Sequence, residues 1–160
     1  MSYDSILYRA PSGFAGDLTR ATAPFTAEPN ISSEAIDFGS PVVYDTGKVR
    51  AVVTTDTAIS GIAIRPFPIQ SSSNAFGTGT YAAGDVVDVL KDGYIAVKVQ
   101  NTTVPVRGGA VYVRVVAATG LVIGGFEAAD DAANTFLVAG ATFNGGVDAN
   151  GTSEIHIAAL

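Results

Sequence analysis

The stretch from Asp85 to Gln100, which reads DVVDVLKDGYIAVKVQ, gives the clearest structural signal in the chain. Valine, isoleucine and leucine dominate both of its halves, and such residues favour β-strands. The halves are separated by Lys91-Asp92-Gly93, and an Asp-Gly pair between two apolar runs is typical of a type I′ turn. In the second half Ile95, Val97 and Val99 recur at every second position and so share one face. The stretch therefore predicts a β-hairpin with one buried face.

Short β-branched runs of the same kind recur on both sides of this stretch, separated by turns rich in glycine and proline. They predict strands at 42–44, 49–53, 61–65, 111–116, 136–143 and 153–159. Asp45-Thr46-Gly47 is expected to join the first two, and Arg114 to point outward from a strand whose valines are buried. Residues 70–80 are expected to form a flexible loop, and 126–134 a loop or at most one short helical turn.

No run in the chain predicts a long helix. Many half-apolar strands can bury their apolar faces only if the sheet closes or if sheets stack. We therefore expect an all-β fold, an antiparallel β-sandwich or barrel-like body of the jelly-roll or tulip-like kind, with an extended N-terminal arm. Residues 1–40 would form the arm and residues 41–160 the β-rich body.

The predicted arm combines apolar residues with proline. Pro11, Pro24 and Pro29 lie within it, and its apolar positions follow neither a helical nor a strand period. We expect it to lie across a neighbouring subunit, the alternative being that it folds back on its own domain. The candidate residues for contact with the partner are its aromatic and apolar anchors and two arginines: Tyr3, Leu7, Tyr8, Arg9, Phe14, Leu18, Arg20 and Phe25.

The composition excludes several classes of function. The net charge is −6 and the basic residues are scattered, so nucleic acid is an unsuitable partner. The chain has no cysteine, it starts without a secretory signal, and no apolar run is long enough to span a membrane. We expect synthesis in a cytosolic compartment. Charged residues are 15% and hydrophobic residues 48% of the chain, so some apolar surface is expected to meet another chain.

Chemistry-bearing residues are few. His156 is the single histidine, and alternation places it on an outward face beside Glu154, which favours a solvated or interface residue over a catalytic one. The stretch Asp148–Glu154 has oxygen-bearing side chains, but an Asn-Gly turn explains it better than a calcium loop does. We expect no catalytic residue, no metal and no cofactor.

The order of several short segments resembles the tailed-bacteriophage capsid cement proteins, which are small head decoration proteins of the structural-cement type. The segments that carry the resemblance are 13–20, 26–29, 38–42, 61–66, 84–89, 93–97, 107–113, 139–143 and 154–155. They cover most of the chain, and the specificity lies in their order.

The resemblance implies a non-enzymatic homo-oligomer, dimer or trimer, that binds the major capsid protein on the outside of the head and ties capsomers together. It would be made in the host bacterial cytoplasm and end on the capsid exterior of the virion. On this basis, deletion of Met1–Thr22 is expected to leave a folded body that no longer decorates heads. The alternative is a β-sandwich module of a phage fibre that binds a receptor or glycan. The absence of tryptophan disfavours it.

Overall fold

The fold is all-β and antiparallel, as expected. The computed structural model describes residues 13–20, 23–66, 79–100 and 103–158. Every pairing between named strands is antiparallel. The elements are β1 (Thr26–Ile31), β2 (Ile36–Asp37), β3 (Pro41–Asp45), β4 (Lys48–Ala51), β5 (Gly61–Ala63), β6 (Thr80–Tyr81), β7 (Val86–Lys98), β8 (Ala110–Arg114), β9 (Phe126–Glu127), the 3-10 turn η1 (Ala132–Asn134), β10 (Thr135–Phe143) and β11 (Thr152–Ile157).

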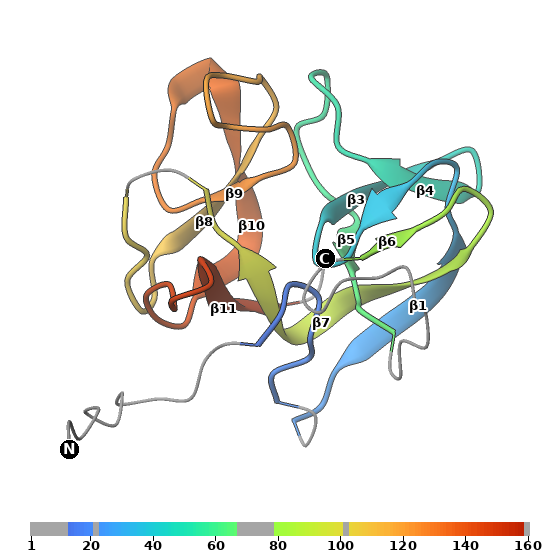
Figure 1. Cartoon of the computed structure of the whole chain (residues 1–160), viewed down its shortest axis with the longest axis horizontal. Helices are drawn as coiled ribbons and strands as arrows, with labels where there is room; N and C mark the ends of the chain where they lie inside the picture. Colours follow the sequence, from blue (N-terminus) through green and yellow to red (C-terminus); the bar gives the residue numbers. More distant parts are fainter. Residues whose placement is uncertain (1–12, 21–22, 67–78, 101–102, 159–160) are drawn as a thin grey trace, which may run out of the picture.

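The hairpin predicted around Lys91-Asp92-Gly93 is wrong, because β7 runs unbroken from Val86 to Lys98. Its N-terminal half pairs with β1 and β5, and its C-terminal half pairs with β11. In Figure 1, β7 runs from the part of the fold that holds β1 and β3–β6 to the part that holds β8–β11. One strand thus belongs to both halves of the molecule.

The Lys91-Asp92-Gly93 segment forms a bend in β7. The register against β1 shifts at this point, where Ala27 lies opposite Leu90 but Thr26 lies opposite Asp92. Lys91 is therefore an extra residue, as in a β-bulge, and such a residue reverses which positions face each side. In a regular strand, an even-numbered and an odd-numbered residue face opposite sides. Because of the extra residue, Leu90 and Ile95 both face the same side and enter the larger of the protein's two apolar cores.

The first half of the sheet curls until its ends meet. Its strand order is β4-β3-β5-β7, with β1 on the other side of β7, and Ser32 just after β1 forms a bridge to Val49 in β4. The apolar side chains enclosed by this half form the smaller of two cores, to which the short β2–β6 pair also contributes. Its members are Ile36, Phe38, Val42, Val49, Ala63, Tyr81, Val87 and Val89.

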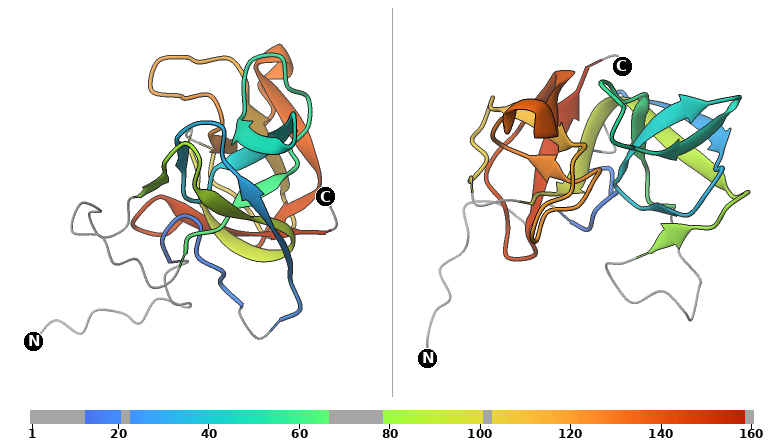
Figure 2. Two further views of the ribbon diagram at one scale, coloured as in Figure 1. Left: turned by 90° about the vertical axis from the view of Figure 1, so that its right-hand side faces the viewer. Right: turned by 90° about the horizontal axis from the view of Figure 1, so that it is seen from above.

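The second half curls in the same way through β7, β11, β10, β8 and β9. The chain beyond β7 then meets β9, since the Gln100 amide donates to the Phe126 carbonyl at 2.9 Å. The larger core fills this half and also takes in Ile62 and Ile64, from β5 and just beyond it. The right-hand view in Figure 2 shows the two curled halves side by side, and the shared core makes them one body.

Most of the other strand predictions are confirmed. The β3–β4 hairpin turns at Thr46 and Gly47, whose φ angles of 50° and 78° are both positive, as a type I′ turn requires. The strands predicted at 61–65, 136–143 and 153–159 correspond to β5, β10 and β11, and η1 is the short turn expected in 126–134. The loop predicted at 70–80 falls almost wholly outside the described residues.

The outward orientation expected for Arg114 is wrong, because its side chain is only 2% exposed. The valines of β8 do face the larger core, as expected. The opposite face is covered as well: β9 pairs with β8, and the chain after β8 supplies a carbonyl acceptor at Val116 and a carboxylate at Asp131. Arg114 is therefore buried because both faces of β8 are covered by other parts of the chain.

The described part of the predicted arm contacts its own chain. The Gly16 amide donates to the Ala96 carbonyl of β7 at 2.8 Å, β1 pairs with the N-terminal half of β7, and Ile36 and Phe38 lie in the smaller core. Residues 1–12 and 21–22 lie outside the described residues. An assembly arm therefore stays a prediction.

Candidate interaction surface

Phe14 lies in a tight turn at the start of the described chain. Its backbone amide donates to the Asp17 carboxylate at 2.9 Å, which closes the turn. The Arg65 guanidinium lies 4.9 Å from the centre of the Phe14 ring and 3.5 Å from the Asp17 carboxylate. A cation over an aromatic face is attractive. Phe14 is thus held in place by Arg65, which follows β5 in the same chain.

Leu18 and Arg20 extend this attachment along β7. Leu18 forms an antiparallel bridge with Ile95 and contacts the larger core. The Arg20 guanidinium lies 4.2 Å from the centre of the Tyr94 ring and 2.8 Å from the Glu154 carboxylate. Both predicted anchors therefore hold residues 13–20 on the sheet.

The Arg20–Glu154 pair also changes a protonation equilibrium. Burial alone would raise the pKa of Glu154, but hydrogen bonds from Arg20 and Asn144 outweigh it and hold the pKa below its usual value. Glu154 therefore stays ionised at neutral pH and keeps its bond to Arg20.

Phe25 differs from these three residues because 47% of it is exposed. It lies beside the bend in β7, where a Cβ added to Gly93 would come within 2.8 Å of the Phe25 Cβ. The other predicted contact residues, Tyr3, Leu7, Tyr8 and Arg9, are outside the described residues. The structure thus brings Phe14, Leu18 and Arg20 together beside β7 and leaves Phe25 on the surface.

Several exposed apolar side chains were not among the predicted contact residues. Val104, Val106 and Val122 are 63%, 65% and 65% exposed, and Ile123 is 37% exposed. A signal for the last two was available, because residues 115–126 contain no charge. Exposed apolar side chains on a protein with so few charges suit contact with another chain.

The charge-free segment carries a small, ordered hairpin. Ala118 and Leu121 exchange two backbone hydrogen bonds, at 3.0 and 2.9 Å, around Gly120 with a φ angle of 75°. The Gln100 side chain fixes the following residue, because it donates to the Val122 carbonyl and accepts from the Val122 amide, both at 2.9 Å. Val122 and Ile123 are therefore presented on a held backbone.

A buried ion pair supports the base of this hairpin. The Arg114 guanidinium donates to both carboxylate oxygens of Glu127 and, at 2.7 Å, to Asp131. The side chains of Arg114 and Glu127 are each 2% exposed. Gln100 also donates to Glu127, at 3.2 Å. The pair thereby links β8, β9 and the residue that holds Val122.

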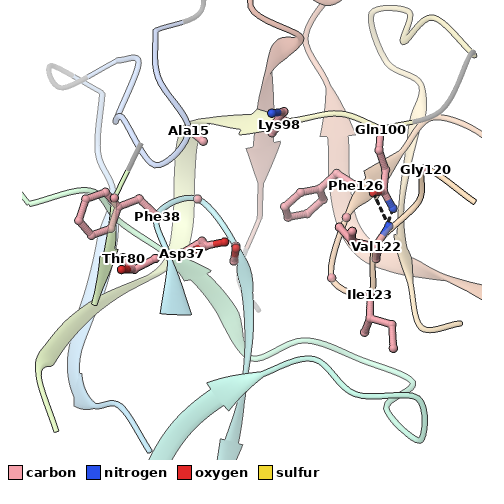
Figure 3. A pocket seen from close by; sticks show the side chains of 15 residues that line it. Ala15, Asp37, Phe38, Thr80, Lys98, Gln100, Gly120, Val122, Ile123 and Phe126 are labelled. Atoms are coloured by element: carbon pink, nitrogen blue, oxygen red, sulfur yellow. Dashed lines mark hydrogen bonds between the residues drawn. The ribbon is translucent and has the colours of Figure 1, made fainter. Parts of the chain in front are cut away.

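A groove of about 690 Å³ lies between the two halves of the fold. Figure 3 shows Asp37, Phe38 and Thr80 on one side and Gln100, Val122, Ile123 and Phe126 on the other, with Ala15 and Lys98 between them. The hairpin of residues 118–121 and the chain that follows it form one wall. The groove therefore joins apolar groups to one acidic and one basic side chain.

His156 occupies a packed position. Its ring lies 4.4 Å from the centre of the Tyr94 ring at an angle of 30°, next to the Arg20–Glu154 pair.

The Asp148 carboxylate accepts from the Asn150 amide and from both the amide and the hydroxyl of Thr152, so it closes a turn.

The described residues contain neither a metal-binding cluster nor a membrane-spanning helix. No group of three or more histidine, aspartate or glutamate side chains in the described ranges is arranged to hold a metal ion. Within those same ranges, no helix has the length and hydropathy needed to cross a membrane.

Comparisons with known proteins show a family and a shared fold. A family model described as "Structural cement protein (E217 gp24/Pam3 gp6)" matches residues 4–158. A chain from the structure titled "The capsid of Myoviridae Phage XM1" superposes with a TM-score of 0.69 at 21% sequence identity, covering 98% of both chains. At that identity the likeness shows a shared fold. No curated protein matches the chain significantly.

Proposed function

Because the chain belongs to the family of phage structural cement proteins, we propose that it binds the outer surface of an assembled capsid and bridges neighbouring capsomers. Membership of the family gives it a capsid-stabilising structural role. The observation that carries the proposal is the family match over residues 4–158, which spans both halves of the fold.

The surface of the protein supports a role in adhesion. A shell under the pressure of packaged DNA fails where capsomers meet, and a protein bound to both sides of such a seam adds contacts that must break first. Many equivalent copies make weak contacts effective, since linked contacts act at a high effective concentration. Exposed apolar groups such as Val104, Val106 and Val122 suit such contacts.

The proposal includes partners and location. The protein binds the major capsid protein and its own copies, as a dimer or trimer, on the capsid exterior of the virion after synthesis in the host cytoplasm. Tyr3, Leu7, Tyr8, Arg9 and Phe25 take part in these contacts, while Phe14, Leu18 and Arg20 hold the root of the segment. The protein has no catalytic activity of its own.

Co-sedimentation with heads tests the proposal. Purified protein is added to heads stripped of it by urea, and bound copies are counted after centrifugation through sucrose. We expect saturation at a fixed, large number of copies per head. Recovery in a few copies with tail fibres, or no recovery with heads, would contradict the proposed function.

A further inference from the structure

We infer that the groove between the two halves of the fold receives residues 1–12 of a second copy of this chain. The inference rests on the proposed function and specifies how copies are tied to one another. The proposed ligand of this groove is an extended peptide with apolar side chains and one charge of each sign. The groove is lined by residues that include Phe38, Lys98 and Val122.

The groove has the features that hold an extended peptide. Val122 and Ile123 provide apolar contacts on one side, and Asp37 and Thr80 line the other side. The wall that carries Val122 is held by the Gln100 side chain and by the buried Arg114–Glu127 pair. A wall that is already ordered loses little conformational entropy when a ligand binds.

The proposed ligand matches the groove in chemistry. Residues 1–12 read MSYDSILYRAPS, so apolar side chains at Tyr3, Ile6, Leu7 and Tyr8 are accompanied by Asp4 and Arg9. The groove offers Lys98 for the carboxylate and Asp37 for the guanidinium. The apolar side chains can then contact the charge-free wall, because residues 115–126 carry no charge that needs water.

The position of Gly13 favours the groove of another copy. The Gly13 carbonyl oxygen lies 3.0 Å from the Thr152 hydroxyl of β11, and neither residue lines the groove. Ala15, at the turn that Asp17 closes, borders the groove instead. Gly13, where the described chain begins, therefore lies beside β11 and outside the groove.

The experiment uses disulfide formation between full-length chains, since the natural chain has no cysteine. A tagged Leu7→Cys chain is mixed with an untagged Val122→Cys chain and oxidised, and the mixed dimer is measured on a non-reducing gel. Val106→Cys is the matched control, because Val106 and Val122 are both 65% exposed and only Val122 lines the groove. We expect at least about tenfold more mixed dimer with Val122→Cys than with Val106→Cys.

Two results would overturn the inference. One is equal dimer yield with the two partners. The other is a disulfide within a single Leu7→Cys/Val122→Cys chain, because the ligand would then be the chain's own segment. Urea unfolding of each variant verifies the fold, which an exposed Val122→Cys change leaves intact. Head co-sedimentation of the same variants separates the proposals: equal yields with normal decoration refute the groove assignment alone, whereas wild-type protein that fails to bind heads refutes the proposed function alone.

Discussion

The Arg114 guanidinium carries a full charge at a position that is 2% exposed. A buried charge is costly unless a partner of opposite charge and hydrogen bonds compensate it. Glu127 and Asp131 provide both, and the hydrogen bond that Arg114 donates to Glu127 is the largest cause of the raised pKa of Arg114. The ion pair therefore ties β8 to β9 at the base of the charge-free hairpin.

Glu127→Gln should therefore destabilise the protein by about 3 kcal/mol, because it removes one charge of a buried pair. Glu154→Gln is the matched control, since it changes the same residue type in the Arg20–Glu154 pair, whose arginine is 44% exposed. That change should cost less than about 1 kcal/mol. Urea unfolding at pH 7 measures both, and equal costs would contradict the importance of burial.

Asp56 gives a prediction on pH. Two hydrogen bonds from Arg50, opposed by burial, lower the pKa of Asp56 below its ordinary value. A carboxylate with a lowered pKa in the folded state contributes stability above its unfolded pKa of about 3.9, and this is lost as the pH falls through the lowered value. The difference in urea midpoint between the wild type and Arg50→Gln should be full at pH 7 and shrink below about pH 4. A difference that stays constant down to pH 2 would contradict this.

At the scale of the element, β7 organises the fold because it is the only strand in the described ranges that pairs in both halves. Its bend depends on Gly93, which has a φ of 134° and lies against Phe25. A side chain at this position would be strained in its backbone and would clash with the Phe25 Cβ.

Gly93→Ala should destabilise the protein by about 2 kcal/mol or more, the sum of backbone strain and close contact. Gly84→Ala is the control for backbone strain alone, because Gly84 has a φ of 90° with nothing within 4 Å of an added Cβ. It should cost about 1 kcal/mol. Urea midpoints decide between them, and a Gly93→Ala protein as stable as Gly84→Ala would show that the close approach is unimportant.

The two halves of β7 could be predicted from the sequence. The conformation of the Lys91-Asp92-Gly93 segment that connects them could not. Runs of apolar residues identified both halves of β7, although neighbouring positions such as Ile95 and Ala96 are both buried. Asp92-Gly93 suits a tight turn and a bulge equally, since glycine permits positive φ in either. The choice is made by β1, β5 and β11, which pair along β7 and are distant in sequence.

At the scale of the whole molecule, the segment 13–20 belongs to the body. The Gly16 and Thr19 amides donate to β7 carbonyls at 2.8 and 3.2 Å, and the Ala96 amide donates to the Asp17 carbonyl at 2.9 Å. Deletion of Met1–Ser12 should therefore leave the urea midpoint unchanged. Deletion of Met1–Thr22 should lower the free energy of unfolding by about 3 kcal/mol, because each of the three lost hydrogen bonds contributes about 1 kcal/mol.

Both deletions should reduce head binding at least about tenfold, because they remove the segment that carries Leu7 and Tyr8. Co-sedimentation measures the binding and urea unfolding the stability. Normal decoration by the Met1–Ser12 deletion would refute the role of the segment. A Met1–Thr22 deletion as stable as the wild type would show that residues 13–20 add nothing to the body.

The candidate surface could be predicted in part. Composition indicated that apolar surface would meet another chain, and the fold leaves Val104, Val106 and Val122 exposed. The groove could not be predicted, because its walls come from residues 37–40, 79–80 and 120–126, which meet only when both halves have curled. Phe14 and Leu18 were assigned to a partner, since an apolar residue in the sequence does not reveal which surface will cover it.

The temperature at which stripped heads release their DNA, measured with and without added protein, tests the capsid-stabilising role most directly. A protein that bridges capsomers must raise this temperature, and the rise must level off at the same protein concentration at which head binding saturates. A release temperature that does not change while the protein is fully bound would contradict the account.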